Sequence, residues 1–221
     1  MGAACACIWT RRTRAAAEDL LATGLFAGVT TNPTILRRAS RGVGDIAEIY
    51  RWALDAGARE VFFQAWGEDP ETLVKRGAEL RELGEEVVVK LVASRAGAAA
   101  CAALAADGVP TLLTAVYNPA QAVVAAAAGA TYIAPYLGKL QEAGRDAVGD
   151  VSAMQDVLRA TGSSTKILLA SIRDVRSVVE LARRGVDHFT LAPDVAEQLF
   201  AEELTARAVQ MFEDAVRETT P

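Results

Sequence analysis

Short runs of β-branched and aromatic residues alternate along the chain with longer stretches rich in Ala, Glu and Arg. The short runs recur about every 20 to 30 residues and have the composition of buried strands, whereas the longer stretches have the apolar spacing of helices. The pattern predicts eight strands, at residues 5–9, 26–30, 60–66, 87–92, 111–116, 131–136, 166–171 and 188–192.

The predicted helices are bounded by residues that start and stop helices. Six of them end at a glycine in the position of a C-cap, and several begin with Ser, Thr, Asp or Pro. These six helices span residues 13–24, 70–84, 94–108, 119–129, 151–162 and 173–185.

Eight strand–helix units follow one another without a linker or a change in composition, so residues 1–221 are expected to form one domain. Eight units of this kind fit a closed parallel (β/α)8 TIM barrel, an α/β fold. An open, doubly wound sheet is the competing arrangement, but no G-x-G-x-x-G follows the first strand and no GxxxxGK[ST] occurs. A long amphipathic helix at 200–221 would pack either on its own barrel or on a neighbouring subunit, and the sequence leaves both open.

The composition narrows the class of protein. Of the 221 residues, 52% are hydrophobic and 23% are charged, with a net charge of −5, which fits a compact soluble domain and argues against nucleic-acid binding. The first residues lack the features of an export signal, and the longest apolar stretch, 109–137, is broken by prolines, so we expect a cytoplasmic protein without a membrane partner. Three cysteines without C-x-x-C spacing and a single histidine argue against disulfides and a metal site.

One charged residue lies in the middle of a strongly apolar strand. Alternation along 87–92 places Val88, Lys90 and Val92 on one face, so Lys90 would stand among valines inside the barrel. Desolvation there favours the neutral amine and lowers the lysine pKa, as a Schiff-base nucleophile requires near neutral pH. The alternative is a lysine whose ammonium group reaches solvent from the strand end.

Polar residues stand at the carboxyl ends of several other strands, where active sites are built in this fold. A purely structural role is the alternative. The residues after the second strand could form an ordinary turn with a helix N-cap, and the buried Gln, Thr and Tyr could satisfy one another's hydrogen bonds. Facing the barrel mouth, they would surround Lys90. These residues are Thr30, Thr31, Asn32, Gln64, Thr114 and Tyr136.

Cations follow the sixth and seventh strands. Lys139 comes after the sixth strand, and Ser171 and Arg173 precede a helix N-terminus after the seventh. Such groups predict a pocket for a small anion, with solvated surface cations as the alternative.

Five segments carry a family resemblance: GVTTNPTIL, VVVKLVAS, PTLLTAVYNPAQA, TYIAPYLGK and LLASIRD. In this order and with these separations they closely resemble the small transaldolases and fructose-6-phosphate aldolases, over nearly the whole chain. The resemblance implies a class I aldolase that needs no metal or organic cofactor. It also implies a Schiff base between Lys90 and a ketose, a donor hydroxyl held by Asn32, and a substrate site that includes Thr31 and Ala134.

The resemblance further distinguishes two branches of the family. In the aldolase branch a glutamine, a tyrosine and a threonine position the water that moves protons, and these match Gln64, Tyr136 and Thr114. Typical transaldolases carry a glutamate and a phenylalanine at the first two positions. By this criterion the chain is more similar to the aldolases, in which the enamine left after cleavage is protonated.

Two positions depart from the family pattern. Members carry an aspartate at the end of the first strand, where this chain has Thr10, which cannot act as a carboxylate base. The family's phosphate-binding arginine after the sixth strand is Lys139 here, which loses the bidentate fork, whereas Ser171 and Arg173 fit the remaining phosphate positions.

The sequence therefore predicts a Schiff-base aldolase or transaldolase that cleaves or transfers a dihydroxyacetone unit of a ketose phosphate such as fructose 6-phosphate. Two alternatives stay open: a true transaldolase with an unusual donor or acceptor, and a catalytically impaired sugar-phosphate-binding protein, which the missing aspartate permits. Because small family members often form ring-based oligomers with exchanged C-terminal helices, the resemblance also implies a homo-oligomer.

Overall fold

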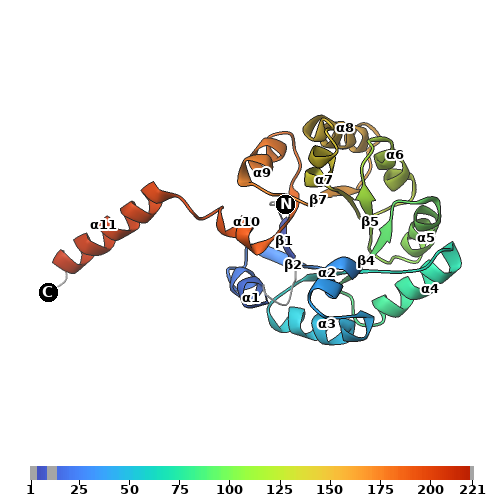
Figure 1. Cartoon of the computed structure of the whole chain (residues 1–221), viewed down its shortest axis with the longest axis horizontal. Coiled ribbons are helices and arrows are strands. Elements are labelled where there is room, and N and C mark those ends of the chain that lie inside the picture. The colour runs from blue at the N-terminus through green and yellow to red at the C-terminus, as the bar shows by residue number, and fades with distance from the viewer. Residues whose placement is uncertain (1–3, 9–13, 220–221) are drawn as a thin grey trace.

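The strands form a closed parallel barrel. A computed structural model describes residues 4–8 and 14–219, which leaves Thr10 outside the described residues. The strands pair in chain order and the last pairs with the first, which confirms the expected (β/α)8 fold (Figure 1). They are β1 (Ala4–Ile8), β2 (Phe26–Thr30), β3 (Glu60–Gln64), β4 (Val87–Val92), β5 (Thr111–Val116), β6 (Tyr132–Pro135), β7 (Lys166–Leu169) and β8 (His188–Leu191).

Helices surround the barrel and connect successive strands, and two further helices, α10 and α11, follow the last strand (Figure 1). They are α1 (Arg14–Ala22), α2 (Pro33–Arg38), α3 (Ile46–Asp55), α4 (Pro70–Arg81), α5 (Arg95–Ala106), α6 (Ala120–Ala127), α7 (Leu137–Glu142), α8 (Ala147–Ala160), α9 (Val175–Ala182), α10 (Pro193–Glu197) and α11 (Glu203–Thr219), with a 3-10 turn η2 (Val43–Asp45) before α3.

The predicted helix boundaries hold to within a few residues. All six glycines that end predicted helices have positive φ, for example +74° at Gly108, a backbone conformation that costs glycine little because it lacks a Cβ atom. The helix predicted from residue 151 begins earlier, at Ala147, because the Asp146 side chain accepts a hydrogen bond from the Gly149 N–H and caps it. Helix α3 is absent from the predicted set, since its Ile, Tyr and Trp residues are typical of strands.

Alternation along the strands separates two apolar cores. In β4, Val89 and Leu91 belong to the large core between barrel and helices, whereas Val88 belongs to a small cluster inside the barrel. Phe62, Leu112 and the other members of the inner cluster fill the barrel, so its lower part is packed with side chains. The face predicted for Val88 and Lys90 is therefore the inward face.

Within the described residues, four strands end earlier than predicted, at Gln64, Pro135, Leu169 and Leu191. Beyond the ends of β6 and β7, Tyr136 and Ala170 still pair with each other as an isolated parallel bridge, and the loops above the barrel begin after them. After β7, for example, Ser171 takes a φ of +60°, which is incompatible with a continuing strand. The shortening leaves polar residues at the carboxyl rim.

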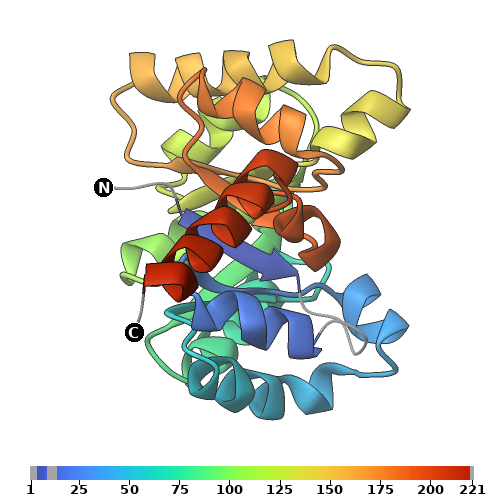
Figure 2. The ribbon, with the colours of Figure 1, turned by 90° about the vertical axis from the view of Figure 1, so that its left-hand side faces the viewer.

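Helix α11 extends away from the barrel, as Figure 1 shows, and in Figure 2 it lies in front of the barrel wall. None of its residues is buried against the described part of the chain. Helix α11 therefore does not pack on its own barrel, which was one of the two expected arrangements. None of the helices described is long and apolar enough to cross a membrane.

Candidate active site

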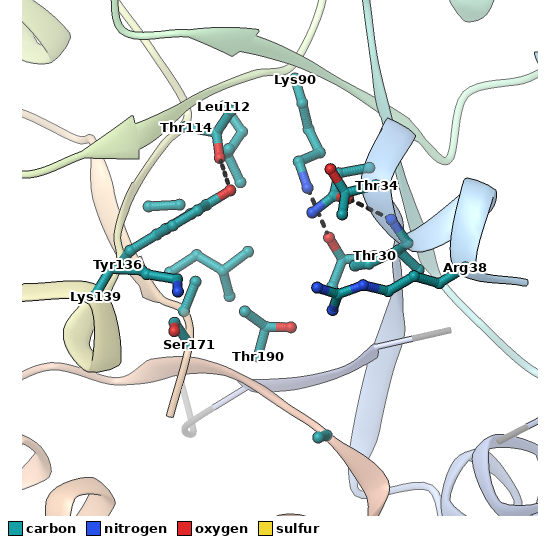
Figure 3. Close-up of a pocket in the computed structure, with 16 residues that line it drawn as sticks. Thr30, Thr34, Arg38, Lys90, Leu112, Thr114, Tyr136, Lys139, Ser171 and Thr190 are labelled. Atoms are coloured by element: carbon teal, nitrogen blue, oxygen red, sulfur yellow. Dashed lines mark hydrogen bonds between the residues drawn. The ribbon is translucent and has the colours of Figure 1, made fainter. Parts of the chain in front are cut away.

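A cavity of about 480 Å³ opens at the carboxyl ends of the strands. Its apolar lining includes Leu112, Ala134 and Leu168, which belong to the inner cluster of the barrel. Its polar lining comes from several strands and the loops after them, and Figure 3 shows these side chains converging on one space. The polar members are Thr30, Asn32, Thr34, Arg38, Lys90, Thr114, Tyr136, Lys139, Ser171 and Thr190.

Lys90 lies in this cavity with its amine held on two sides. Nζ donates to the Thr30 hydroxyl oxygen at 3.0 Å and to the Thr31 carbonyl oxygen at 2.6 Å. A neutral amine has two N–H groups, and these two acceptors use both of them. The two N–H bonds and the bond to Cε take three of the four tetrahedral directions around the nitrogen. The lone pair therefore takes the fourth.

Burial changes the acidity of this lysine. The side chain is only 5% exposed, and none of the described residues that line the cavity carries a carboxylate. Desolvation of the ammonium form lowers the pKa of Lys90 to about 7. At neutral pH a substantial fraction of the amine is thus unprotonated and nucleophilic.

Thr114 and Tyr136 form a hydroxyl pair beside this amine. Their oxygens are 2.8 Å apart, and both side chains line the cavity (Figure 3). A β-bulge positions the threonine, because the register of β5 against β6 shifts between Leu113 and Val116 and Ala115 has a φ of +57°. The two hydroxyls can hold and relay a proton through a water molecule.

The N-terminus of α2 supplies the next two predicted residues. Asn32 caps the helix, its Oδ1 accepting from the Ile35 N–H at 2.7 Å, and the residue lines the cavity. The Thr31 hydroxyl donates to the Phe62 carbonyl oxygen at 3.2 Å and does not line the cavity. The structure therefore turns its carbonyl, rather than its hydroxyl, toward the site.

The three predicted anion-binding residues meet at the cavity mouth. Lys139 and Ser171 line the cavity, whereas Arg173 does not. Lys139 and Arg173 both pair with the carboxylate of Glu142, at 2.7 Å for Lys139. Gly138 brings α7 onto the seventh-strand loop, since its N–H donates to the Ser171 carbonyl oxygen and a Cβ there would lie 2.6 Å from that oxygen. Glu142, which the sequence argument did not consider, offsets one of the two positive charges.

Gln64 lies near the lysine without entering the cavity. It ends β3, its Cα is in register with that of Lys90, and its side chain is half-buried. Its amide makes no hydrogen bond within the described part of the chain and does not line the cavity. Ala134, in contrast, lines the cavity as expected.

Three polar residues that line the cavity are missing from the predicted site: Thr34, Arg38 and Thr190. Thr34 and Arg38 follow Asn32 on α2, and helical spacing places residues 34 and 38 on one face. Thr190 stands two residues after His188 in β8, so strand alternation assigns both to the inward face. The spacing of residues along α2 and β8 would therefore have predicted all three, once it was known that these two elements face the cavity.

Comparisons with known proteins identify the family. The sequence pattern of the family described as Transaldolase/Fructose-6-phosphate aldolase matches residues 11–220. A probable transaldolase from Coprothermobacter proteolyticus is 36% identical over 86% of each chain, and one from Phenylobacterium zucineum is 37% identical over 88% of each. The solved structure of a thiamine phosphate pyrophosphorylase from Pyrococcus furiosus shares the fold, with a TM-score of 0.58, 13% identity, and coverage of 86% of this chain and 85% of that one. The chain belongs to the transaldolase/fructose-6-phosphate aldolase family.

Proposed function

We propose that this enzyme of the aldolase and transaldolase class acts through a Schiff base on Lys90 and takes a ketose phosphate such as fructose 6-phosphate as donor. The observation that carries the proposal is the buried amine, which has two fixed acceptors and a pKa lowered to about 7 and lines an open cavity. Burying a lysine costs free energy, and a catalytic role for the neutral amine would explain why this lysine is buried.

The proposed chemistry begins with addition of the Lys90 nitrogen to the C2 carbonyl of the ketose. Loss of water gives an iminium ion, which accepts electrons from the C3–C4 bond. As the C4 hydroxyl gives its proton to a water held by Thr114 and Tyr136, that bond breaks, and the electron pair forms an enamine. Carbons 4 to 6 leave as an aldehyde phosphate, which is glyceraldehyde 3-phosphate when the donor is fructose 6-phosphate.

The enamine has two fates. Water held by Thr114 and Tyr136 can protonate C3, after which hydrolysis of the imine releases dihydroxyacetone and the free lysine. Alternatively, the enamine attacks an acceptor aldehyde, which is transaldolase chemistry. Gln64 is proposed to help position the water, as the resemblance to the aldolase branch implies.

The remaining residues are proposed to hold the substrate. Asn32 donates its free amide hydrogens to a donor hydroxyl, and Ala134 leaves room for the carbon chain. Lys139, Ser171 and Arg173 receive the phosphate at the mouth, where it would displace the carboxylate of Glu142 from both cations.

Borohydride trapping tests the mechanism. With fructose 6-phosphate and borohydride, we expect a mass increase by one reduced three-carbon unit, located by peptide mapping on Lys90 and absent without sugar. A mass increase on another lysine, or none at all with a sugar that binds, contradicts the proposal. Release of glyceraldehyde 3-phosphate with and without acceptor aldehyde then separates the two activities, since only a transaldolase depends on the acceptor.

We further propose that α11 packs on a second copy of the chain. Its apolar side is uncovered, with Leu204, Met211 and Phe212 between 60% and 71% exposed. Burying such a face favours association by roughly 25 cal/mol per Å² of apolar surface removed from water.

Removal of α11 is expected to dissociate the assembly. Light scattering should give an oligomeric mass for the full chain and a monomeric mass for a chain ending at Ala201. Phe212→Asp should have the same effect, whereas Gln210→Ala on the opposite, polar side should leave the mass unchanged. A full chain that is monomeric at micromolar concentration would show that α11 has a different role.

A further inference from the structure

One buried hydroxyl in the cavity has no partner. Thr190 in β8 is 4% exposed, and its Oγ1 is the buried side-chain polar atom that lacks a hydrogen bond among the described residues. A valine would fill the same space without that cost. Because Thr190 lines the cavity that contains Lys90, the hydroxyl is placed to bind a molecule that enters it (Figure 3).

The position of Thr190 limits what it can bind. β8 and β4 are on opposite sides of an eight-stranded barrel, so Thr190 faces Lys90 across the cavity. Thr190 also lies within its strand, whereas Lys139 and Ser171 lie in the loops and helix beyond strand ends. It is therefore deeper in the barrel than the cations at the mouth.

Nearby polar groups already have partners. The Thr30 oxygen accepts from Lys90, and the hydroxyls of Thr114 and Tyr136 bind each other. Thr190 is thus the deep hydroxyl that makes no hydrogen bond among the described residues, so both its donor and its acceptor sites are available for a substrate hydroxyl.

We propose that Thr190 binds the C1 hydroxyl of the ketose and makes the enzyme selective for donors that carry it. The inference rests on the proposed function, because C2 is then fixed at Lys90. The phosphate on C6 lies at the cation-lined mouth, and the C3–C4 bond lies near Thr114 and Tyr136. The C1 end therefore points away from the mouth, toward the depth at which Thr190 lies.

The test combines a change in the protein with a change in the substrate. Wild type, Thr190→Val and Thr190→Ser are compared on fructose 6-phosphate and on 1-deoxyfructose 6-phosphate, which lacks only the C1 hydroxyl. Unphosphorylated glyceraldehyde is added as acceptor, so that release of glyceraldehyde 3-phosphate reports either activity.

We expect Thr190→Val to lower kcat/KM for fructose 6-phosphate about tenfold, the loss of one hydrogen bond, and to leave kcat/KM for the 1-deoxy sugar unchanged. Thr190→Ser should keep most of the wild-type preference. Equal losses on both sugars, or no loss on either, would overturn the inference, as would a wild type that does not distinguish the two sugars.

Stability and trapping separate the remaining explanations. Valine removes an unpaired hydroxyl and keeps the side-chain volume, so Thr190→Val should melt at or above the wild-type temperature. Should this variant fail to fold, the serine variant and the wild-type preference still decide the question. If the proposed function itself is wrong, wild type turns over neither sugar and forms no borohydride adduct, which overturns both.

Discussion

Lys90→Met should reduce turnover of fructose 6-phosphate by roughly three orders of magnitude or more, because methionine cannot form the covalent intermediate. The side chain is similar in length and apolar, so the packing among the inner residues of the barrel should persist. Release of glyceraldehyde 3-phosphate measures the loss, and borohydride treatment should leave the peptide that contains residue 90 unmodified.

Lys139→Met is the matched control. This lysine lines the same cavity, but it is exposed and pairs with Glu142. We expect a higher KM for phosphorylated donors with kcat close to that of wild type, and an unchanged adduct on Lys90. A Lys90→Met variant with substantial activity, or one whose adduct moves to Lys139, would refute the proposed nucleophile.

The same Lys90→Met substitution should stabilise the fold at neutral and acidic pH. Burial lowers the pKa of Lys90 from 10.5 to about 7, so the folded state resists protonation that the unfolded chain accepts. Below pH 7 the amine is charged in both states and the wild type bears the full penalty. Between pH 7 and 10.5 the penalty shrinks, and above 10.5 it vanishes, since the amine is neutral in both states.

The expected gain is on the order of a few kcal/mol at pH 6, reduced by about 1 kcal/mol because the Thr31 carbonyl loses its N–H partner. Denaturant unfolding of both proteins at pH 6 and at pH 10 measures it. The gain should be much smaller at pH 10, and Lys139→Met should show no such pH-dependent difference. A gain that is equal at both pH values would mean that Lys90 is not desolvated as the geometry indicates.

Most of the fold could be predicted from local pattern. The eight strands and six glycine-ended helices follow from periodicity and capping, which act over a few residues. Helices α3, α7 and α10 are missing from the predicted set, and α3 shows the limit of such reasoning. Its Ile, Tyr and Trp residues are buried by tertiary packing, which outweighs their preference for strands.

The sequence predicted several residues that line the cavity, but it did not predict which chemical group of each residue is presented there. Thr31 illustrates this, because its type suggests a hydroxyl ligand, whereas the turn before α2 directs its carbonyl to the lysine. Arg173 and Lys139 suggest two free cations, but the close approach of α7 and the seventh-strand loop gives both the same carboxylate partner.

The sequence by itself determined the barrel, the inward face of Lys90 and the family, because alternation and motif order are properties of consecutive residues. Only the tertiary structure decided that the amine has two acceptors, that Thr190 has no hydrogen-bond partner among the described residues, and that α11 does not pack on its own barrel. These contacts form only because the closed barrel brings together strands that are far apart in the chain. The position of each polar group relative to its partners is therefore fixed by barrel closure and loop packing, and not by local preference.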